Sequence, residues 1–261
     1  PRPAGACTPD LYNEIGIIAR QHGIGVHLHL AASQEDIPFF KRNFGKSAIE
    51  FIRDVGLLGP NVLLIHAIWL TESDIGILAK TNTNVCHCPS SNTKLALGLA
   101  KVPEMLRAGI NVSLGCDGAP SNDSYDMIRE MKLAACIHKA RLLDPTIMPA
   151  EQVIEMATIN GARALGWEKE IGSLEAGKKA DIILIDLKKP HLVPYRNIPS
   201  NLVYACMGSD VETVIINGKI IMENSVLKTI DENSVIEKTV KLAEDIDKKA
   251  GLVIRPRWKE Y

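Results

Sequence analysis

The segment Ile24-Gly-Val-His-Leu-His-Leu30 is an apolar, strand-like run with histidines at every second position near its end. Three similar runs follow it along the chain, at 61–66, 83–87 and 110–115. Helix-like stretches with apolar residues at helical spacing separate these runs, at 8–21, 45–56, 103–108 and 124–142. Strands that alternate with amphipathic helices predict parallel βαβ units in an α/β fold.

The second half of the chain has a different pattern. After a predicted helix at 149–164, short β-rich runs follow at 180–186, 202–205, 211–216 and 219–222. Asn217-Gly218 between two of these runs predicts a type I′ hairpin. An amphipathic helix with Val235, Ile236 and Val240 closes the chain. We therefore expect three parts, at 1–168, 169–228 and 229–261.

Composition restricts the class of function. The 261 residues are 46% hydrophobic and 23% charged, with a net charge of -1, so no overall field favours nucleic acid or a membrane surface. No apolar stretch approaches the ~20 residues that span a bilayer. Six cysteines lack a Cys-x-x-Cys spacing, which predicts free thiols in a reducing cytoplasm.

The number of βα units leaves two interpretations open. Only about four such units are present, whereas a closed parallel barrel needs about eight strands. The chain is either a small open α/β sheet or the later part of a longer barrel.

Three polar side chains follow the strand-like runs directly. His29 ends the first run, His66 the second, and Asp117 follows the fourth. Active sites of parallel α/β folds collect at this edge, and imidazole and carboxylate groups are the usual ligands of Zn²⁺ or Fe²⁺. The alternative is that each is an ordinary hydrogen-bonded residue. His27 lies on the same side of its strand as His29, and His138 is expected on a helix surface.

Four motifs resemble strands five to eight of the amidohydrolase superfamily, in the same order. They are Val26-His-Leu-His-Leu-Ala31, Leu64-Ile-His-Ala-Ile-Trp-Leu70, His87-Cys-Pro-Ser-Ser-Asn92 and Gly115-Cys-Asp-Gly-Ala-Pro-Ser-Asn122. They are most similar to the methylthioadenosine/S-adenosylhomocysteine deaminase and triazine chlorohydrolase group. The resemblance implies the C-terminal part of a (βα)₈ TIM-type barrel plus part of a composite β-sandwich.

The resemblance also implies roles for individual residues. His29 would bind the metal, with zinc favoured and iron as the alternative, and Asp117 would bind it and accept a proton from its water. His66 would orient that water or the developing oxyanion. Ser121 and Asn122 would line the substrate pocket, although these residues or Asp123 also suit the N-cap of the following helix. His87 and Asn92 are expected to fix a loop.

Two features depart from the superfamily pattern. Its strand-one His-x-His pair is missing upstream of residue 24, so we expect the N-terminal strands to lie outside this sequence. Ala32 stands where the group has a glutamate that transfers a proton to the substrate ring, and an acid–base group of this kind contributes ~10²–10⁴-fold.

We therefore expect a hydrolase of non-peptide C–N bonds in a nitrogen heterocycle, either a purine nucleoside derivative or a triazine. One alternative is an enzyme that displaces halide or alkylamine from a ring. A second is a catalytically silent fragment or paralogue that keeps the fold. The expected partner is a small-molecule substrate, and a homo-oligomer is compatible with these features.

Overall fold

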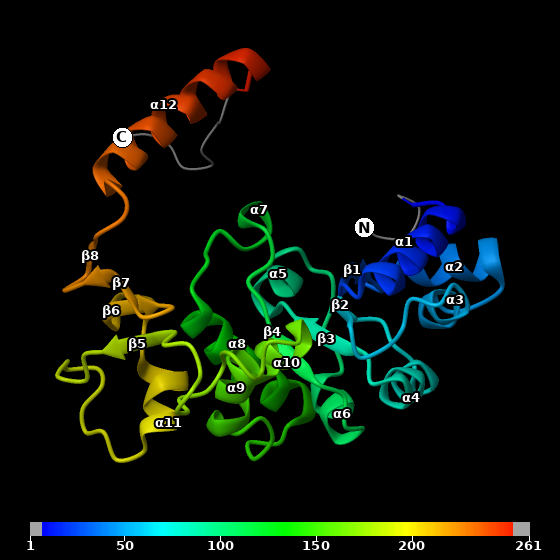
Figure 1. The fold of residues 1–261 in the computed structure, drawn as a ribbon, viewed down its shortest axis with the longest axis horizontal. Coiled ribbons are helices and arrows are strands. Elements are labelled where there is room, and N and C mark those ends of the chain that lie inside the picture. The colour runs from blue at the N-terminus through cyan, green and yellow to red at the C-terminus, as the bar shows by residue number, and fades with distance from the viewer. Residues whose placement is uncertain (1–6, 253–261) are drawn as a thin grey trace.

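The computed structural model describes residues 7–252, and its first half contains a four-stranded parallel sheet in the order β1-β2-β3-β4 (Figure 1). The strands are β1 (Val26–Leu30), β2 (Val62–His66), β3 (Asn84–His87) and β4 (Val112–Leu114). Leu30 lies opposite His66, and His87 lies opposite Leu114. The strand ends that carry the predicted site residues therefore meet at one edge of the sheet.

Helices precede, connect and follow these strands. They are α1 (Pro9–His22), α2 (Asp36–Phe44), α3 (Ala48–Asp54), α4 (Glu72–Thr81), α5 (Pro89–Lys94), α6 (Val102–Arg107), α7 (Ala119–Asn122), α8 (Met127–Leu142), α9 (Ala150–Ala157) and α10 (Ile159–Leu165). Local sequence caps two of these helices: the Thr8 side chain accepts from Leu11 N, and Thr71 and Asp74 form a capping box.

Period-two patterning divides the sheet into two faces. Leu28, Leu64 and Val85 have no exposed surface and pack against the helices. Leu63, Ile65 and Cys86 point to the other face, where they form a smaller buried cluster with Cys88 and Ala164 of α10. The second face is the one that would turn inward if the sheet curved into a barrel.

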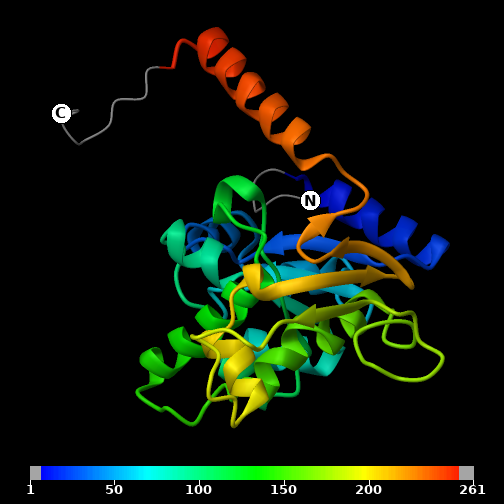
Figure 2. The ribbon, with the colours of Figure 1, turned by 90° about the vertical axis from the view of Figure 1, so that its left-hand side faces the viewer.

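The second half of the chain forms a separate antiparallel sheet, which lies beside the first body (Figure 2). Its strands are β5 (Ile182–Ile185), β6 (Val211–Ile216), β7 (Lys219–Glu223) and β8 (Val226–Leu227). Asn217 and Gly218 both have positive φ, at 48° and 76°, which confirms the predicted type I′ turn. Both residue types tolerate this conformation.

Two predictions about elements in this half were wrong. Residues 202–205 are not a strand, because they form the π-helical turn η1 (Asn201–Ala205), which follows α11 (Ile198–Ser200) and buries Val203. The Cys206 N–H closes this turn on the Asn201 carbonyl at 2.9 Å. The predicted helix at 149–164 is broken at Thr158, whose ψ of -97° separates α9 from α10.

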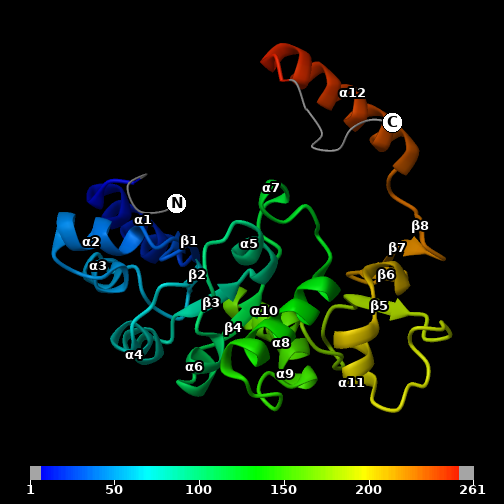
Figure 3. The same cartoon turned by 180° about the vertical axis from the view of Figure 1, so that it is seen from behind.

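The last helix, α12 (Glu232–Ala250), stands away from both sheets (Figures 1 and 3). It has an apolar stripe, as predicted, but none of its residues is buried. No helix within residues 7–252 combines the length and the apolar character needed to cross a bilayer. Residues 253–261 of the expected C-terminal part lie outside the described residues.

Candidate functional site

The structure brings together His29, His66 and Asp117, the three residues predicted from their positions at strand ends. The rings of His29 and His66 meet edge to face, with centroids 5.1 Å apart. The His66 Nε2 atom lies 3.9 Å from Asp117 Oδ2. His27 stacks on His29 at 6.0 Å, on the same side of the strand as predicted. Two imidazoles and one carboxylate from three different strand ends thus form one polar cluster.

Asp117 is held as a carboxylate by its neighbours. The Ser91 hydroxyl donates to Oδ2 at 2.5 Å, and the backbone N–H of Gly118 donates to Oδ1 at 2.7 Å. Partial burial raises the pKa of Asp117, but these hydrogen bonds and the two histidines outweigh it, so the pKa lies below its usual value. The group is therefore ionised at neutral pH and can bind a cation or accept a proton.

His66 is oriented by Asn92. The Asn92 Oδ1 atom lies 2.9 Å from His66 Nδ1, and an amide oxygen can only accept, so this ring nitrogen carries the proton. The lone pair of the neutral ring is then at Nε2, on the side of Asp117. Asn92 thus acts on His66 itself, beyond the predicted loop-fixing role, and this function was missed in the sequence.

The backbone bends sharply at this edge. Ala31, His66, Ala67 and Asp117 have φ values of 49°, 73°, 44° and 61°, in the left-handed region that non-glycine residues rarely adopt. These residues lie at or just after the carboxyl ends of β1, β2 and β4, so the chain turns where the side chains of the polar cluster lie.

His29 and Asp117 could together supply some of the ligands of a metal ion. Burial lowers the pKa of His29, and nearby His66 lowers it further, so the ring is neutral and offers a lone pair at physiological pH. His29 and Asp117 supply the nitrogen and oxygen donors that zinc accepts. Within residues 7–252, however, no group of three or more His, Cys, Asp or Glu side chains could hold a metal ion by itself. The described chain therefore offers part of a ligand set.

The two residues predicted to line a substrate pocket lie in and around the short helix α7. Ser121 is half-buried, and the Asn122 side-chain amide donates to the Cys116 carbonyl at 2.7 Å and to Glu130 Oε1 at 2.8 Å. The alternative N-cap prediction was wrong, because Asp126 caps α8 by accepting from Ile128 N and Arg129 N. The helix begins a few residues later than predicted.

Ala32 is buried, and neither Glu35 nor Asp36, the two acidic residues that follow it closely, replaces the missing glutamate. The carboxylate of Asp36 accepts from the backbone N–H groups of Ala32 and Ser33 at 2.8 and 3.2 Å, and Glu35 is exposed. Asp36 is therefore engaged in shaping the loop that follows β1.

A second buried polar pair lies behind the site. His138 was expected on the surface, but it is fully buried, and its Nε2 lies 3.2 Å from His87 Nε2. The prediction was wrong because α8 turns this residue toward β3. Glu130, also buried on α8, accepts from Ser90 N and Asn122. Through these two hydrogen bonds, helix α8 holds the short helices α5 and α7 in place near Asp117.

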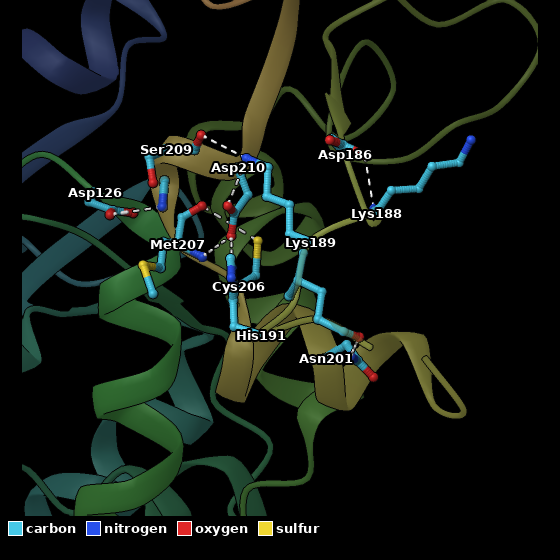
Figure 4. A network of polar contacts seen from close by, with 12 residues as sticks. Asp126, Asp186, Lys188, Lys189, His191, Asn201, Cys206, Met207, Ser209 and Asp210 are labelled. Atoms are coloured by element: carbon cyan, nitrogen blue, oxygen red, sulfur yellow. Dashed lines mark hydrogen bonds and ion pairs between the residues drawn. The ribbon is translucent and has the colours of Figure 1, made fainter. Parts of the chain in front are cut away.

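Asp210 organises the loops next to the antiparallel sheet (Figure 4). Its carboxylate accepts from His191 Nε2 at 2.8 Å and from Lys189 Nζ at 3.0 Å. Burial raises the pKa of Asp210, but the hydrogen bonds from His191, Met207 N and Lys189 hold it well below its usual range. The adjacent Gly208 N–H donates to Asp126, the cap of α8. His191 thus has a structural role.

Comparison with known sequences shows extensive similarity. The sequence model of the amidohydrolase family matches residues 1–221. The chain is 47% identical to a 5-methylthioadenosine/S-adenosylhomocysteine deaminase of Moorella thermoacetica, over 92% of the chain and 56% of that relative. It is 44% identical to a 5′-deoxyadenosine deaminase of Methanosarcina mazei, over 94% of the chain and 56% of that relative. The chain thus spans little more than half the length of these curated relatives.

Solved structures show the same relationship. A zinc-bound adenosine deaminase from Xanthomonas campestris superposes with a TM-score of 0.93 at 30% identity, covering 95% of this chain and 56% of the other. A zinc complex of atrazine chlorohydrolase from Arthrobacter aurescens superposes with a TM-score of 0.86 at 25% identity, covering 92% and 54%. The architecture around the polar cluster is therefore that of these zinc-containing enzymes.

Proposed function

This protein belongs to the amidohydrolase family, and from that membership we propose that it is a metal-dependent hydrolase of C–N bonds in a nitrogen heterocycle. The observation that carries the proposal is the meeting of His29, His66 and Asp117 at one edge of the parallel sheet. Relatives named as deaminases of adenosine derivatives support purine nucleoside derivatives as the substrate class. In this reaction water replaces the ring amino group and ammonia leaves.

The residues of this chain have separate roles in the proposal. His29 and Asp117 would hold the cation, with zinc favoured by the related structures and iron as the alternative. When bound, such a cation supplies Lewis acidity that lowers the pKa of a coordinated water toward ~7. Asp117, already ionised, accepts the proton released from water, and His66 orients the reacting oxygen through the nitrogen opposite Asn92. Ser121 and Asn122 would line the pocket.

Ala32 supports a second candidate of the same class. A methyl group cannot protonate the substrate ring, so a substrate with a better leaving group would react with less assistance. Halide is such a leaving group, and the structure resembles a chlorohydrolase. The position of Ala32 therefore makes the choice of leaving group the decisive experimental question.

The proposal also covers the division of the chain into parts. We propose that 1–168 is part of a (βα)₈ barrel, that 169–228 is part of a composite β-sandwich, and that 229–261 is a terminal helix and tail. Strands beyond the four described would bring the remaining metal ligands. The free thiols of the described residues favour a reducing cytoplasm, and the expected ligand is a small heterocycle rather than nucleic acid.

Metal content and turnover test the proposal together. Purified protein is analysed for zinc and iron and then incubated with 5′-deoxyadenosine, methylthioadenosine and a chlorinated triazine, with ammonia and chloride as readouts. Asp117→Asn should lower both metal retention and turnover, the latter by roughly 10²-fold or more. Asp123→Asn is the matched control, because that carboxylate is exposed and pairs with Lys94.

Absence of stoichiometric metal would rule out the metal-dependent hydrolase. Equal turnover by the Asp117→Asn and unsubstituted proteins would remove Asp117 from the mechanism. Ala32→Glu separates the two candidates. A gain of about 10-fold or more on amino substrates would identify the missing acid as the limit on deamination. An unchanged rate on amino substrates, combined with chloride release, would favour the displacement reaction.

A further inference from the structure

We propose that Cys86 and Cys88 form a two-thiolate binding site for a soft monovalent cation of the Cu(I) type, on the inner face of the parallel sheet. The site is independent of the hydrolase proposal, because it uses neither His29 nor His66. It differs from the catalytic cluster in ligand chemistry, since both donors are sulfur.

Backbone geometry brings the two sulfurs together. Cys86 lies on β3 and Cys88 directly after the strand, so their side chains leave the same face. Both are buried, with 8% and 1% of their surface exposed. A Cβ atom added to Gly115 of the neighbouring chain segment would lie 2.6 Å from Cys86 Sγ and 3.5 Å from Cys88 Sγ. The two sulfurs therefore share the space that the missing side chain leaves.

The two thiols also interact with each other. The neighbouring Cys88 thiol and Ser113 hydroxyl lower the pKa of Cys86, against the effect of burial. The same interaction, together with burial, raises the pKa of Cys88. The two thiols are therefore close enough to influence each other's ionisation.

The surroundings select a soft cation. Two thiolates satisfy an ion that prefers sulfur and a low coordination number, whereas zinc requires about four ligands. No cluster of three metal-binding side chains occurs within the described part of the chain. Leu63, Ile65 and Ala164 pack around the thiols, and such an apolar shell disfavours hard cations that keep their water.

The binding step balances without a redox partner. Two Cu–S bonds form and two S–H bonds break, and both protons go to solvent. Copper is Cu(I) before and after binding, so no electron is transferred. The proton release makes the observed affinity increase with pH.

Anaerobic titration of the reduced protein with Cu(I), in competition with a coloured Cu(I) chelator, tests the site. One Cu(I) per chain should be retained, with two sulfur neighbours in X-ray absorption. Cys86→Ser and Cys88→Ser should each lose the retained ion, whereas Cys136→Ser and Cys206→Ser should keep it. Cys136 is exposed and Cys206 is buried elsewhere, so they are matched controls.

Retention of copper by Cys86→Ser or Cys88→Ser at the level of the unsubstituted protein would overturn the proposal. Gly115→Ala provides a test that keeps all six cysteines. Its methyl group would displace both sulfurs, and affinity should fall about tenfold or more. Unchanged affinity in Gly115→Ala, with circular dichroism of the folded protein, would also contradict the shared site.

Discussion

At the residue scale, Asn92 determines which nitrogen of His66 faces Asp117. Asn92→Ala removes the acceptor for the buried Nδ1–H, and an unpaired buried donor costs about 1–3 kcal/mol. We expect lower stability to urea and lower turnover, because the neutral ring can then adopt the other tautomer. Urea unfolding and steady-state kinetics measure the two effects.

Asn43→Ala is the matched control for this substitution. Asn43 donates to the Phe39 carbonyl on an exposed helix face, so its loss should change stability by about 0.5 kcal/mol or less. Equal effects of the two substitutions would show that the Asn92–His66 contact has no special role.

The sequence predicted the principal site residues because strand ends are recognisable from apolar runs. His29, His66 and Asp117 follow such runs, and parallel strands align their ends. Ser91 and Asn92 were harder to assign, since their contacts depend on how the short helix α5 turns after β3. His138 was misplaced because histidine is polar, although the residue lies at helical spacing with the buried Met131 and Ala135 and shares their face of α8.

At the element scale, the Asp126 cap joins α8 to the antiparallel sheet. Asp126→Ala removes the acceptor for Ile128 N and Arg129 N and for Gly208 N, so we expect a loss of about 1–2 kcal/mol. Thermal unfolding followed by circular dichroism measures it.

Asp231→Ala is the control, since Asp231 caps α12 by accepting from Ser234 N. That helix buries none of its residues, so fraying of its first turn should leave the main transition unchanged. Similar shifts for both substitutions would contradict the linking role of Asp126.

The His87–His138 contact between α8 and β3 predicts acid sensitivity. Burial, assisted by Arg141, lowers the pKa of His138 to about 4 from 6.5. Between these values the unfolded chain binds more protons than the folded chain, so stability falls as pH falls through this window. Above pH 6.5 the residue is neutral in both states and contributes no slope. The expected loss by pH 4 is on the order of 3 kcal/mol.

Urea unfolding at intervals between pH 7.5 and 4 measures this slope. His138→Gln should reduce it, because glutamine does not titrate, and the exposed His22→Gln should leave it unchanged. Burial also holds the pKa of His87 well below its usual value, so part of the slope should remain. An undiminished slope in His138→Gln would assign the acid sensitivity to other groups.

Several elements were predictable, and two were not, for physical reasons. The Asn217-Gly218 hairpin and the Thr71–Asp74 capping box are local, so their residues suffice to predict them. The run at 202–205 is apolar and β-branched in part, yet it packs on α8 and α9 without a strand partner and coils into a turn. Such packing depends on distant segments and overrides local preference.

At the scale of the whole molecule, α12 is separable from the rest. It has no buried residue, so a chain ending at Ile230 loses little packing. We expect its main unfolding temperature to stay within about 2 °C of that of the full chain. Differential scanning calorimetry of the two chains measures the difference, and a drop of about 5 °C or more would show that the helix packs on the body in solution.

The overall α/β organisation followed from alternating patterns, since every predicted strand of the first half is present. The hydrophobic pattern of the sequence could not show whether the sheet belongs to a closed barrel, because four strands suit an open sheet as well as part of a barrel. The motif resemblance, supported by the zinc-containing structures, carried that inference.

The left-handed backbone at Ala31, His66, Ala67 and Asp117 has a consequence for how this protein can evolve. Conformations of this kind cost on the order of 1–3 kcal/mol each and persist only where the surroundings enforce them. Selection for thermostability alone would therefore favour glycine or asparagine at these positions, including the two that carry the chemistry. A library enriched for heat resistance should drift away from activity at this edge before it does so anywhere else in the sheet.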